Sequence, residues 1–410
     1  MIKKIKVSQL RPGIFVHDFD CGLDPHNIFI NKTLIKSSKS IDILKTWGIQ
    51  EVYIDTERGL DVKRERPAVP SKKRSVLEKK SRNLTRPKAV ASTVPLKEEA
   101  VMVRLIKQDA VDIMEKTVTA VQKGTRVDID NTFRLVEKME ASVSRNKDAL
   151  VMLTRIREKN EYTLMHSISV TSLVLAFCNY CKIPSKITIN MATGALLHDI
   201  GKIHVPLTIL DKPGKLEEDE FVVMKKHSEF SAQILSETTG LPSEAFDIAL
   251  HHHERYDGTG YPHGLQGDAI SFCSRVTSIC DVYDAITSDR CYRPGLDSVV
   301  GLQKIYEWSG DHFDMDLAYK FIRCIGVYPI GAYVRLENDL TGVVTDSTEN
   351  MLQPVVRLFY DNKKKKAIPA REINLQLVGM RIAAYDFKDT WPAEKILAFE
   401  QSSRILNPFF

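Results

Sequence analysis

Histidines gather in one part of this sequence. Of the eleven histidines in 410 residues, eight lie between positions 166 and 263. The same stretch carries carboxylates, including Asp199 directly after His198, and Asp281 follows a little later. Neutral imidazole and carboxylate are ligands that suit iron, manganese, nickel and zinc. The cluster therefore predicts a metal site, and activation of a water molecule is chemistry that such a site can perform.

The adjacent pair His198-Asp199 suits a centre with two ions. The pair closes a predicted helix at 187–200, Gly201 ends that helix, and Lys202 follows. A carboxylate has two oxygens and can bridge two cations, whereas an imidazole gives one nitrogen to one ion. Two ions ~3.5–4 Å apart can activate a shared water and neutralise a phosphoryl group. Alone, the pair is equally compatible with a polar helix end, so the prediction depends on the residues around it.

Three stretches together resemble the signatures of the HD-GYP domain. They are His198–Lys202, His252–Pro262 and Asp281–Arg293. The second stretch is long enough to be highly specific. The resemblance spans about residues 150–327, and residues 1–62 resemble a small domain of unknown function that often precedes HD-GYP domains in bacteria.

The resemblance implies an all-α domain that hydrolyses the bacterial second messenger cyclic di-GMP with two or three divalent metal ions. Among the ligands that it implies, Asp199 bridges the ions. Lys202 is implied to contact a substrate phosphate and to stabilise or protonate the leaving oxygen, and Arg290 and Arg293 to bind the substrate phosphates. Asp199 and Lys202 are thus the candidate catalytic residues. The implied metal ligands are His166, His198, Asp199, His227, His252, His253 and Asp281.

One departure from the family pattern bears on the number of ions. Family members with a third ion carry Glu four residues before the first ligand His166, and this chain has Tyr162 there. We therefore expect two ions. Ligation by His and Asp without Cys favours iron, manganese or nickel over structural zinc. The expected reaction is attack of a metal-bridging hydroxide on phosphorus, which gives linear pGpG and, with a second cleavage, GMP.

Several neighbouring residues receive supporting roles. The register of the loop at 258–262 leaves His251 outside the ligand set, as a packing or supporting residue, and His263 is interpreted as a surface residue. Asp284 lies three residues after Asp281, near the same helical face, and is a candidate to orient a ligand. In the HD-GYP family the 258–262 loop is also linked to contacts with diguanylate cyclase domains, which are therefore candidate partners.

The length of the chain predicts more than one domain. Apolar positions have helical spacing through the middle of the chain, and short apolar runs separated by turns follow after Pro329, at 332–336, 342–345, 354–360 and 373–378. We predict a small α/β or β-rich N-terminal domain at 1–62, a basic proline-containing linker at 63–95, a helical connector at 96–149, the all-α catalytic domain at 150–327 and a β-rich C-terminal unit at 328–410.

Charge and hydropathy limit the classes of function. The net charge of +5 arises from residues 61–95, which hold eleven Lys and Arg against three Asp and Glu. The rest of the chain is slightly acidic, which argues against nucleic acid as a partner. No apolar run approaches the ~18 residues that span a bilayer. The N-terminus lacks the apolar core of a secretion signal. We therefore expect a cytoplasmic protein without a membrane span.

Three alternatives stay open at this point. The motifs define the phosphate chemistry better than the bases, so the substrate could be another cyclic dinucleotide such as 3′3′-cyclic GMP-AMP. The domain could also be a catalytically silent module that senses the nucleotide or docks a partner. A third class is nucleic-acid binding through the basic linker, for which steep salt dependence would be diagnostic.

Overall fold

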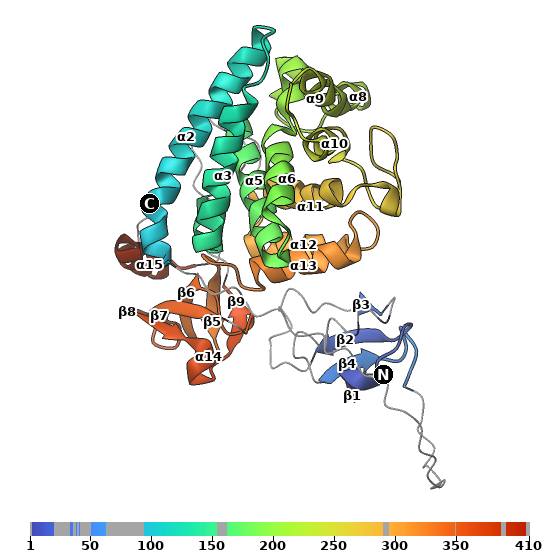
Figure 1. The fold of residues 1–410 in the computed structure, drawn as a ribbon. Helices are drawn as coiled ribbons and strands as arrows, with labels where there is room; N and C mark the ends of the chain where they lie inside the picture. The colour runs from blue at the N-terminus through green and yellow to red at the C-terminus, as the bar shows by residue number, and fades with distance from the viewer. Residues whose placement is uncertain are drawn as a thin grey trace, which may run out of the picture. The chain divides into compact units, whose positions relative to one another are not determined.

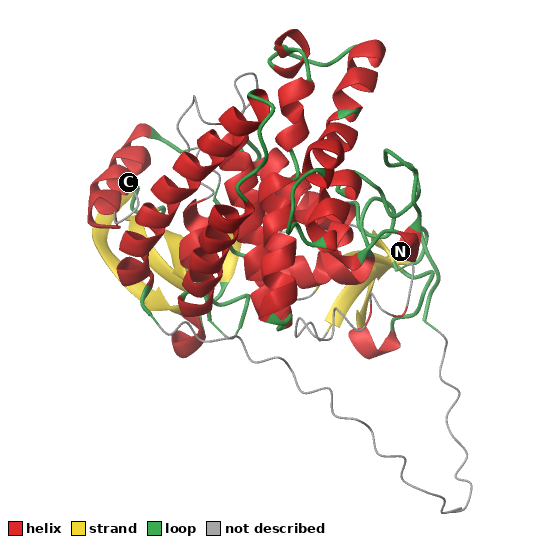
Figure 2. Ribbon diagram, turned by 45° about the horizontal axis from the view of Figure 1, so that its top comes forward, coloured by secondary structure: helices red, strands yellow, loops and turns green. Residues whose placement is uncertain are grey.

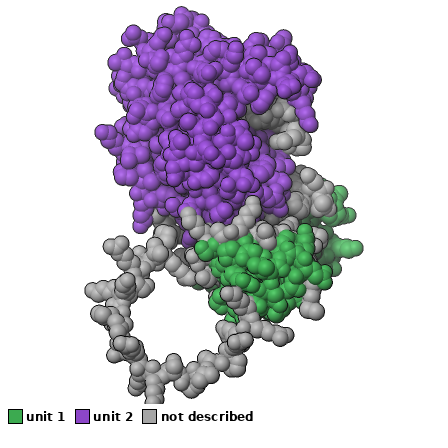
Figure 3. Space-filling view, turned by 90° about the vertical axis from the view of Figure 1, so that its right-hand side faces the viewer, with its two compact units in different colours: residues 1–89, 333–343, 348–396 green, residues 90–332, 344–347, 397–410 purple. Residues whose placement is uncertain are grey.

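The computed structural model describes residues 2–19, 33–35, 38, 41, 51–62, 94–153, 162–289, 295–348, 350–386 and 391–406. The predicted linker at 63–95 lies outside these residues except for its last two positions, and so do Arg290 and Arg293. The chain separates into two compact units, which Figure 3 colours separately and which are described one at a time below. The domain boundaries at 62, 95, 149 and 327 stay predictions.

The N-terminal residues form an antiparallel sheet. Its strands are β1 (Ile2–Lys6), β2 (Phe15–Phe19), β3 (Thr33–Leu34) and β4 (Glu51–Asp55), in the order β1-β4-β2-β3. Burial alternates along β4, where Val52 and Ile54 are buried, so one face of the strand packs inward. The predicted β-rich character of this region is confirmed for its described residues.

Two long helices precede the region that carries the predicted ligands. Helix α2 (Leu96–Gln122) packs beside α3 (Ile129–Arg145), and the short α4 (Lys147–Leu153) follows (Figure 1). Asp128 caps α3 by accepting a hydrogen bond from the Asn131 N–H. The buried carboxylate of Glu99 in α2 accepts hydrogen bonds from Ser142 and Arg145 in α3. These contacts satisfy a charge that would otherwise destabilise the helix pair.

In the described residues from 162 to 325 the regular secondary structure is helical, as predicted, and the helices, red in Figure 2, are joined by loops and two isolated β-bridges. The predicted helix at 187–200 ends earlier, at Leu197, and the chain then enters the 3₁₀ turn η2 (Ile200–His204). The helices are α5 (Tyr162–Cys181), α6 (Ser185–Leu197), α7 (Leu207–Leu210), α8 (Glu218–Lys225), α9 (His227–Ser236), α10 (Ser243–His251), α11 (Phe272–Thr287), α12 (Ser298–Glu307) and α13 (Met315–Ile325).

Helix α5 lies in the core of this unit. Its segment Leu164–Cys181 is long and apolar enough to cross a membrane by length and composition alone, but 78% of that segment is buried inside the protein. Met165, Ile168 and Leu175 belong to the same hydrophobic cluster as residues of α2, α3 and α6. The apolar character of α5 is therefore accounted for by packing against the neighbouring helices.

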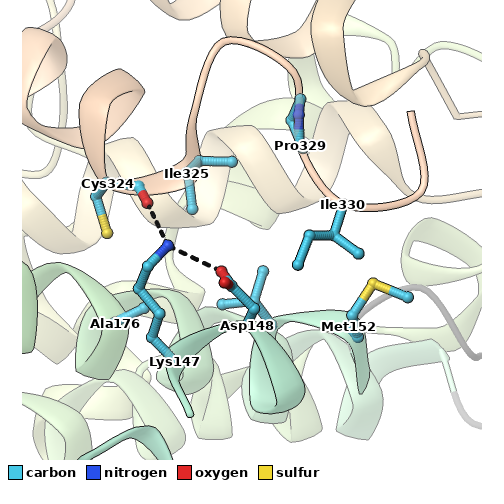
Figure 4. A pocket seen from close by; sticks show the side chains of 9 residues that line it. Lys147, Asp148, Met152, Ala176, Cys324, Ile325, Pro329 and Ile330 are labelled. Carbon is cyan, nitrogen blue, oxygen red and sulfur yellow. Dashed lines mark hydrogen bonds and ion pairs between the residues drawn. The ribbon is translucent and has the colours of Figure 1, made fainter. Parts of the chain in front are cut away.

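A half-buried lysine, Lys147, connects α4 to the end of α13. Figure 4 shows the Lys147 Nζ donating to Asp148 Oδ1 at 2.9 Å and to the Cys324 carbonyl at 3.3 Å. Burial alone would lower the pKa of Lys147, but the charge and hydrogen bond of Asp148, together with Cys324 and Asp346, outweigh burial and raise the pKa. The side chain is therefore a charged donor that anchors the last helical turn of α13.

The C-terminal residues form a second sheet, as predicted. Its order is β8-β7-β6-β5-β9, and the pairs β5–β6, β5–β9 and β7–β8 are antiparallel. The predicted strand at 373–378 is wrong from Leu375 onward, because Asn374 caps the short helix α14 there. The elements are β5 (Tyr333–Leu336), β6 (Leu340–Asp346), β7 (Val355–Asp361), β8 (Lys366–Asn374), α14 (Leu375–Val378), β9 (Ile382–Tyr385) and α15 (Ala393–Leu406).

Candidate metal centre

Five helices bring the seven predicted ligands into one cluster. The cluster contains groups of His and Asp whose ligand atoms lie within 4.8 Å of one another. Each side chain lies within a helix or directly after one, so its position is defined by regular backbone. The side chains are His166 in α5, His198 and Asp199 after α6, His227 at the start of α9, His252 and His253 after α10, and Asp281 in α11.

Asp199 lies between two sets of imidazoles. Its Oδ2 is 3.3 Å from His198 Nε2 and 3.6 Å from His166 Nε2. Its Oδ1 is 3.3 Å from His227 Nε2 and 3.8 Å from His252 Nε2. The two carboxylate oxygens therefore face different groups of nitrogen atoms, which is the arrangement that a bridging carboxylate needs.

The second set of imidazoles is tightly packed. His227 Nε2 is 3.1 Å from His253 Nε2 and 3.4 Å from His252 Nε2. Two nitrogens that each lie about 2.0–2.1 Å from one ion, at an angle of about 90–110°, are about 3 Å apart. The spacing therefore fits nitrogens that share one divalent ion.

Backbone carbonyls orient three of these rings. His198 Nδ1 donates to the Ala195 carbonyl, His227 Nδ1 to the Met224 carbonyl and His252 Nδ1 to the Ile248 carbonyl, at 2.7, 2.7 and 3.0 Å. Because a carbonyl can only accept, the proton is on Nδ1 and the lone pair of Nε2 points into the cluster. Such a partner on the other nitrogen is typical of metal-binding histidines.

Two buried polar atoms in the cluster lack a hydrogen bond from any described residue: His198 Nε2 and Asp199 Oδ1. Burial of polar atoms without a partner is unfavourable unless something satisfies them. A lone pair on nitrogen and a carboxylate oxygen are both electron-pair donors for a cation. The residues present therefore fit a divalent metal ion, as the sequence predicted.

The electrostatics of the cluster also favour metal binding. Burial lowers the pKa of His227 to about 4 and that of His253 to about 3, and it lowers the pKa of His252 as well. These imidazoles are therefore neutral near pH 7, which is the form that binds metal. Burial opposes ionisation of Asp199, but His198 and Lys202 outweigh it and hold the pKa of Asp199 well below its usual range.

His166 differs from the other histidines because carboxylates lie on both sides of its ring. Its Nδ1 is 2.6 Å from Asp284 Oδ2, and its Nε2 is 3.0 Å from Asp281 Oδ1. Burial alone would lower the pKa of His166, but Asp281 and Asp284 together raise it to about 9. An ion that binds Nε2 must therefore displace a proton from that nitrogen.

The protein stripped of metal is expected to be most stable near pH 6.5. His166 has a folded-state pKa of about 9, above its unfolded value, so its contribution is complete below pH ~6.5 and disappears as the pH rises through 9. The pKa values of His227 and His253 are depressed in the folded state, so their contributions disappear as the pH falls from ~6.5 towards 4.

Urea unfolding of chelator-treated protein at a series of pH values measures how the unfolding free energy changes with pH on both sides of this maximum. A pKa change of this size corresponds to at most about 3 kcal/mol of unfolding free energy for His166. In the variant His166→Asn the unfolding free energy should no longer fall as the pH rises above ~6.5. It should still fall as the pH drops below ~6.5. An unchanged upper slope in the variant would contradict the assignment to His166.

The remaining predicted site residues are placed as follows. Lys202 Nζ donates to Asp199 Oδ2, and the lysine side chain is 24% exposed, so it lies at the mouth of the cluster. Arg290 and Arg293 lie outside the described residues. Tyr162 is the first residue of α5, and its side chain is also outside the described part of the chain.

Close backbone packing explains one motif position whose role the sequence did not reveal. A Cβ atom at Gly201 would lie 2.2 Å from the His227 carbonyl oxygen and 2.3 Å from the Ser231 N. Glycine is therefore required where η2 meets α9, because any side chain would push His227 away from Asp199. Ser231 Oγ accepts a hydrogen bond from the Gly201 N–H, so serine is a suitable residue at its position.

Glu254 supports the loop that follows it. Its Oε1 accepts a hydrogen bond from the His263 N–H at 2.8 Å, and its Oε2 accepts one from the Leu265 N–H at 3.0 Å. The loop between them carries Tyr261, whose ring lies 4.7 Å from the His253 ring, centroid to centroid. Sequence proximity to His253 suggests that Glu254 orients a histidine, but its partners are backbone groups of this loop.

Replacing Asp284 by Asn should weaken metal binding without removing a predicted ligand. The Asp284 carboxylate is 2% exposed and orients His166 through its Nδ1. Loss of such an orienting carboxylate typically lowers metal affinity about 10–100-fold. Metal content after dialysis against a graded chelator series measures the change. The exposed Asp211, replaced in the same way, should leave the affinity unchanged; equal affinities of all three proteins would contradict the role of Asp284.

Comparison with known proteins identifies the family of this chain. A family model described as an HD domain matches residues 138–317, and a model described as a domain of unknown function (DUF3391) matches residues 2–132. The chain is 35% identical to the cyclic di-GMP phosphodiesterase PA4108 of Pseudomonas aeruginosa over 408 residues, which covers 95% of this chain and 94% of the relative.

Two shorter matches are to proteins of Vibrio cholerae. One relative, named cyclic di-GMP phosphodiesterase, is 36% identical over 210 residues, or 47% of this chain and 43% of its own. The other, named 3′3′-cGAMP-specific phosphodiesterase 1, is 39% identical over 148 residues, or 36% of this chain and 34% of its own. The match to PA4108 extends over nearly the full length of both proteins. The chain therefore belongs to the HD-GYP domain family of cyclic di-GMP phosphodiesterases, with a DUF3391 domain at its N-terminus.

Proposed function

We propose that this protein hydrolyses cyclic di-GMP to linear pGpG, and onward to GMP, at a centre of two divalent metal ions. The observation that carries the proposal is the position of Asp199, whose two oxygens face two different sets of imidazole nitrogens. A relative that this chain matches over 95% of its length is named a cyclic di-GMP phosphodiesterase.

In this proposal the seven residues divide into two groups around Asp199. One group shares an ion with Asp199 Oδ2 and consists of His166, His198 and Asp281. The other group shares an ion with Asp199 Oδ1 and consists of His227, His252 and His253. When bound, the ions would lower the pKa of a water molecule and neutralise charge on the phosphate. Iron, manganese and nickel suit this donor set, which contains no thiolate.

The chain's own side chains supply the rest of the chemistry. Buried imidazoles and carboxylates provide a rigid, largely water-excluded floor on which a phosphate can be oriented. Lys202 lies at the mouth of the cluster and has three donors, so it would bind a phosphate oxygen and give a proton to the departing 3′-oxygen. Arg290 and Arg293 are proposed to bind the second phosphate of the ring, since guanidinium groups match phosphate geometry.

A second candidate substrate is 3′3′-cyclic GMP-AMP. A relative that is 39% identical over 148 residues carries that specificity in its name. The two substrates share the phosphodiester ring and differ in one base, so the metal cluster alone does not discriminate between them.

Turnover of both nucleotides by the purified protein, loaded with manganese or, without oxygen, with iron, tests the proposal. Chromatography should detect pGpG from cyclic di-GMP, and the double variant His198→Ala/Asp199→Ala should be inactive. Faster cleavage of cyclic GMP-AMP would reverse the substrate assignment. Full metal content without cleavage of either nucleotide would instead support a silent sensing module.

Location and partners belong to the same proposal. We infer action in the cytoplasm, and we infer that diguanylate cyclase domains contact the loop at 258–262. Co-purification of a diguanylate cyclase domain with the wild-type protein, but not with a Tyr261→Ala variant of equal metal content, would support that contact. Equal recovery with both proteins would contradict it.

A further inference from the structure

His251 and His263 form a second histidine pair, distinct from the seven predicted ligands. His251 is the last residue of α10, and His263 lies in the loop that Glu254 anchors. His251 Nε2 and His263 Nδ1 are 3.0 Å apart. The His251 side chain is 15% exposed and His263 is exposed, so solvent reaches the pair.

The distance between the two facing nitrogens of this pair is nearly the same as the distance between neighbouring imidazole nitrogens in the predicted metal site. In the cluster, His227 Nε2 and His253 Nε2 are 3.1 Å apart, compared with 3.0 Å between His251 and His263. Both values match two imidazole nitrogens that bind one ion at about 2.0–2.1 Å each. The two nitrogens of the pair are therefore already close enough together to chelate one ion.

A carboxylate contacts the Nδ1 atom of His251, as another carboxylate contacts the Nδ1 atom of His166. Asp247 Oδ1 is 2.8 Å from His251 Nδ1, and Asp284 Oδ2 is 2.6 Å from His166 Nδ1. Asp247 is itself held by the Ser274 hydroxyl, which donates to its other oxygen at 2.7 Å. A carboxylate on Nδ1 keeps the proton there and leaves the Nε2 lone pair available for a cation.

We propose that His251 and His263 form an accessory site for a divalent transition-metal ion of the zinc, nickel or copper class. His251 Nε2 and His263 Nδ1 are its two protein ligands, water molecules fill the other positions, and Asp247 orients His251. Two imidazoles bind less tightly than the larger ligand sets of the cluster, so this site fills after the cluster does. The proposal does not depend on the activity proposed above.

An ion at this site would join the end of α10 to the loop at 258–265. Both segments are linked to the predicted metal ligands. The ligands His252 and His253 directly follow His251, and the Tyr261 ring of the loop packs against the rings of His253 and His227. Occupancy of the accessory site would therefore restrict the movement of this loop beside the metal cluster.

Equilibrium dialysis of the full-length protein against increasing zinc tests the proposal. The variant His263→Ala should bind one zinc ion fewer per chain in the weaker range and should keep the tightly bound ions. Asp247→Asn should keep the extra ion but bind it about 10–100-fold more weakly. The matched control is His204→Ala, because His204 lies against the Phe230 ring and outside the pair, and it should bind zinc as the wild type does.

Each result decides the question. Equal zinc binding by wild type and His263→Ala would overturn the site and leave the pair as a hydrogen bond between two rings. Unchanged affinity in Asp247→Asn, with circular dichroism showing a folded protein, would contradict the role of Asp247. A loss confined to His263→Ala and a weakening in Asp247→Asn would establish the site.

Discussion

Replacing Asp199 by Asn is expected to remove at least one metal ion per chain and to lower kcat by at least about 10³-fold, the size of several kcal/mol of lost charge stabilisation. Both oxygens of Asp199 face imidazole nitrogens, at 3.3 Å on each side. Asparagine has one acceptor oxygen, and its NH₂ group has no lone pair to offer a cation. In the proposed two-ion centre one side would therefore lose its carboxylate ligand entirely, and the negative charge that balances the ions would be lost as well.

The measurement for this variant combines metal analysis with turnover on the same sample. Unfolding in urea provides the control for structure, because Asp199 is buried and also pairs with Lys202. The exposed Asp268, replaced by Asn, provides the control for the chemical change itself. A folded Asp199→Asn protein with full metal content and near-normal kcat would show that Asp199 does not bridge two ions.

The composition of the metal cluster could be predicted from sequence, but its geometry could not. His198, Asp199, His252 and His253 lie in local motifs whose spacing resembles that of a known family. The orientation of the His198 and His252 rings depends on backbone carbonyls three or four residues earlier, and those contacts form only where a helix ends in the right register. Such hydrogen bonds leave no pattern of residue types, because any residue supplies a carbonyl.

Contacts between residues that are far apart in the sequence could not be predicted from the sequence alone. Gly201 and Ser231 meet because η2 packs against α9, although the helices α7 and α8 lie between the two residues in the sequence. Glu254 lies next to His253 in the sequence, but its carboxylate accepts hydrogen bonds from the backbone N–H groups of His263 and Leu265. A carboxylate next to a histidine in sequence can turn away from it, and only the path of the loop decides.

The errors in the C-terminal sheet have a physical cause of another kind. Strand β8 is exposed or half-buried at every position, so it lacks the alternation of apolar and polar residues by which a strand is predicted. At its end, Asn374 accepts hydrogen bonds from the N–H groups of Gln376 and Leu377 and starts α14. The apolar residues Leu375 to Val378 were predicted as strand because a four-residue run does not distinguish a strand from one helical turn.

Replacing Lys202 by Met is expected to lower kcat about 10²–10³-fold and to leave the metal content unchanged, the size of effect that one positioned acid or one charge-stabilising donor typically has. Lys202 belongs to the short turn after Asp199, and its Nζ contacts Asp199 Oδ2, the oxygen that His166 and His198 also face. The Lys202 side chain is 24% exposed, as is that of His253, whereas the other six predicted ligands are buried. It is therefore a charged donor that a substrate phosphate can reach.

The matched control for Lys202→Met is Lys186→Met, because Lys186 is an exposed lysine in the first turn of α6, at the other end of the helix that leads to Asp199. That control should keep full activity. The variant Lys202→Arg keeps the charge but is a far weaker acid, so partial recovery of kcat would indicate charge stabilisation, and no recovery would indicate proton donation. Loss of metal in Lys202→Met would show instead that the lysine acts by holding Asp199 in place. Retention of both metal and kcat would mean that its ion pair with Asp199 only neutralises the carboxylate.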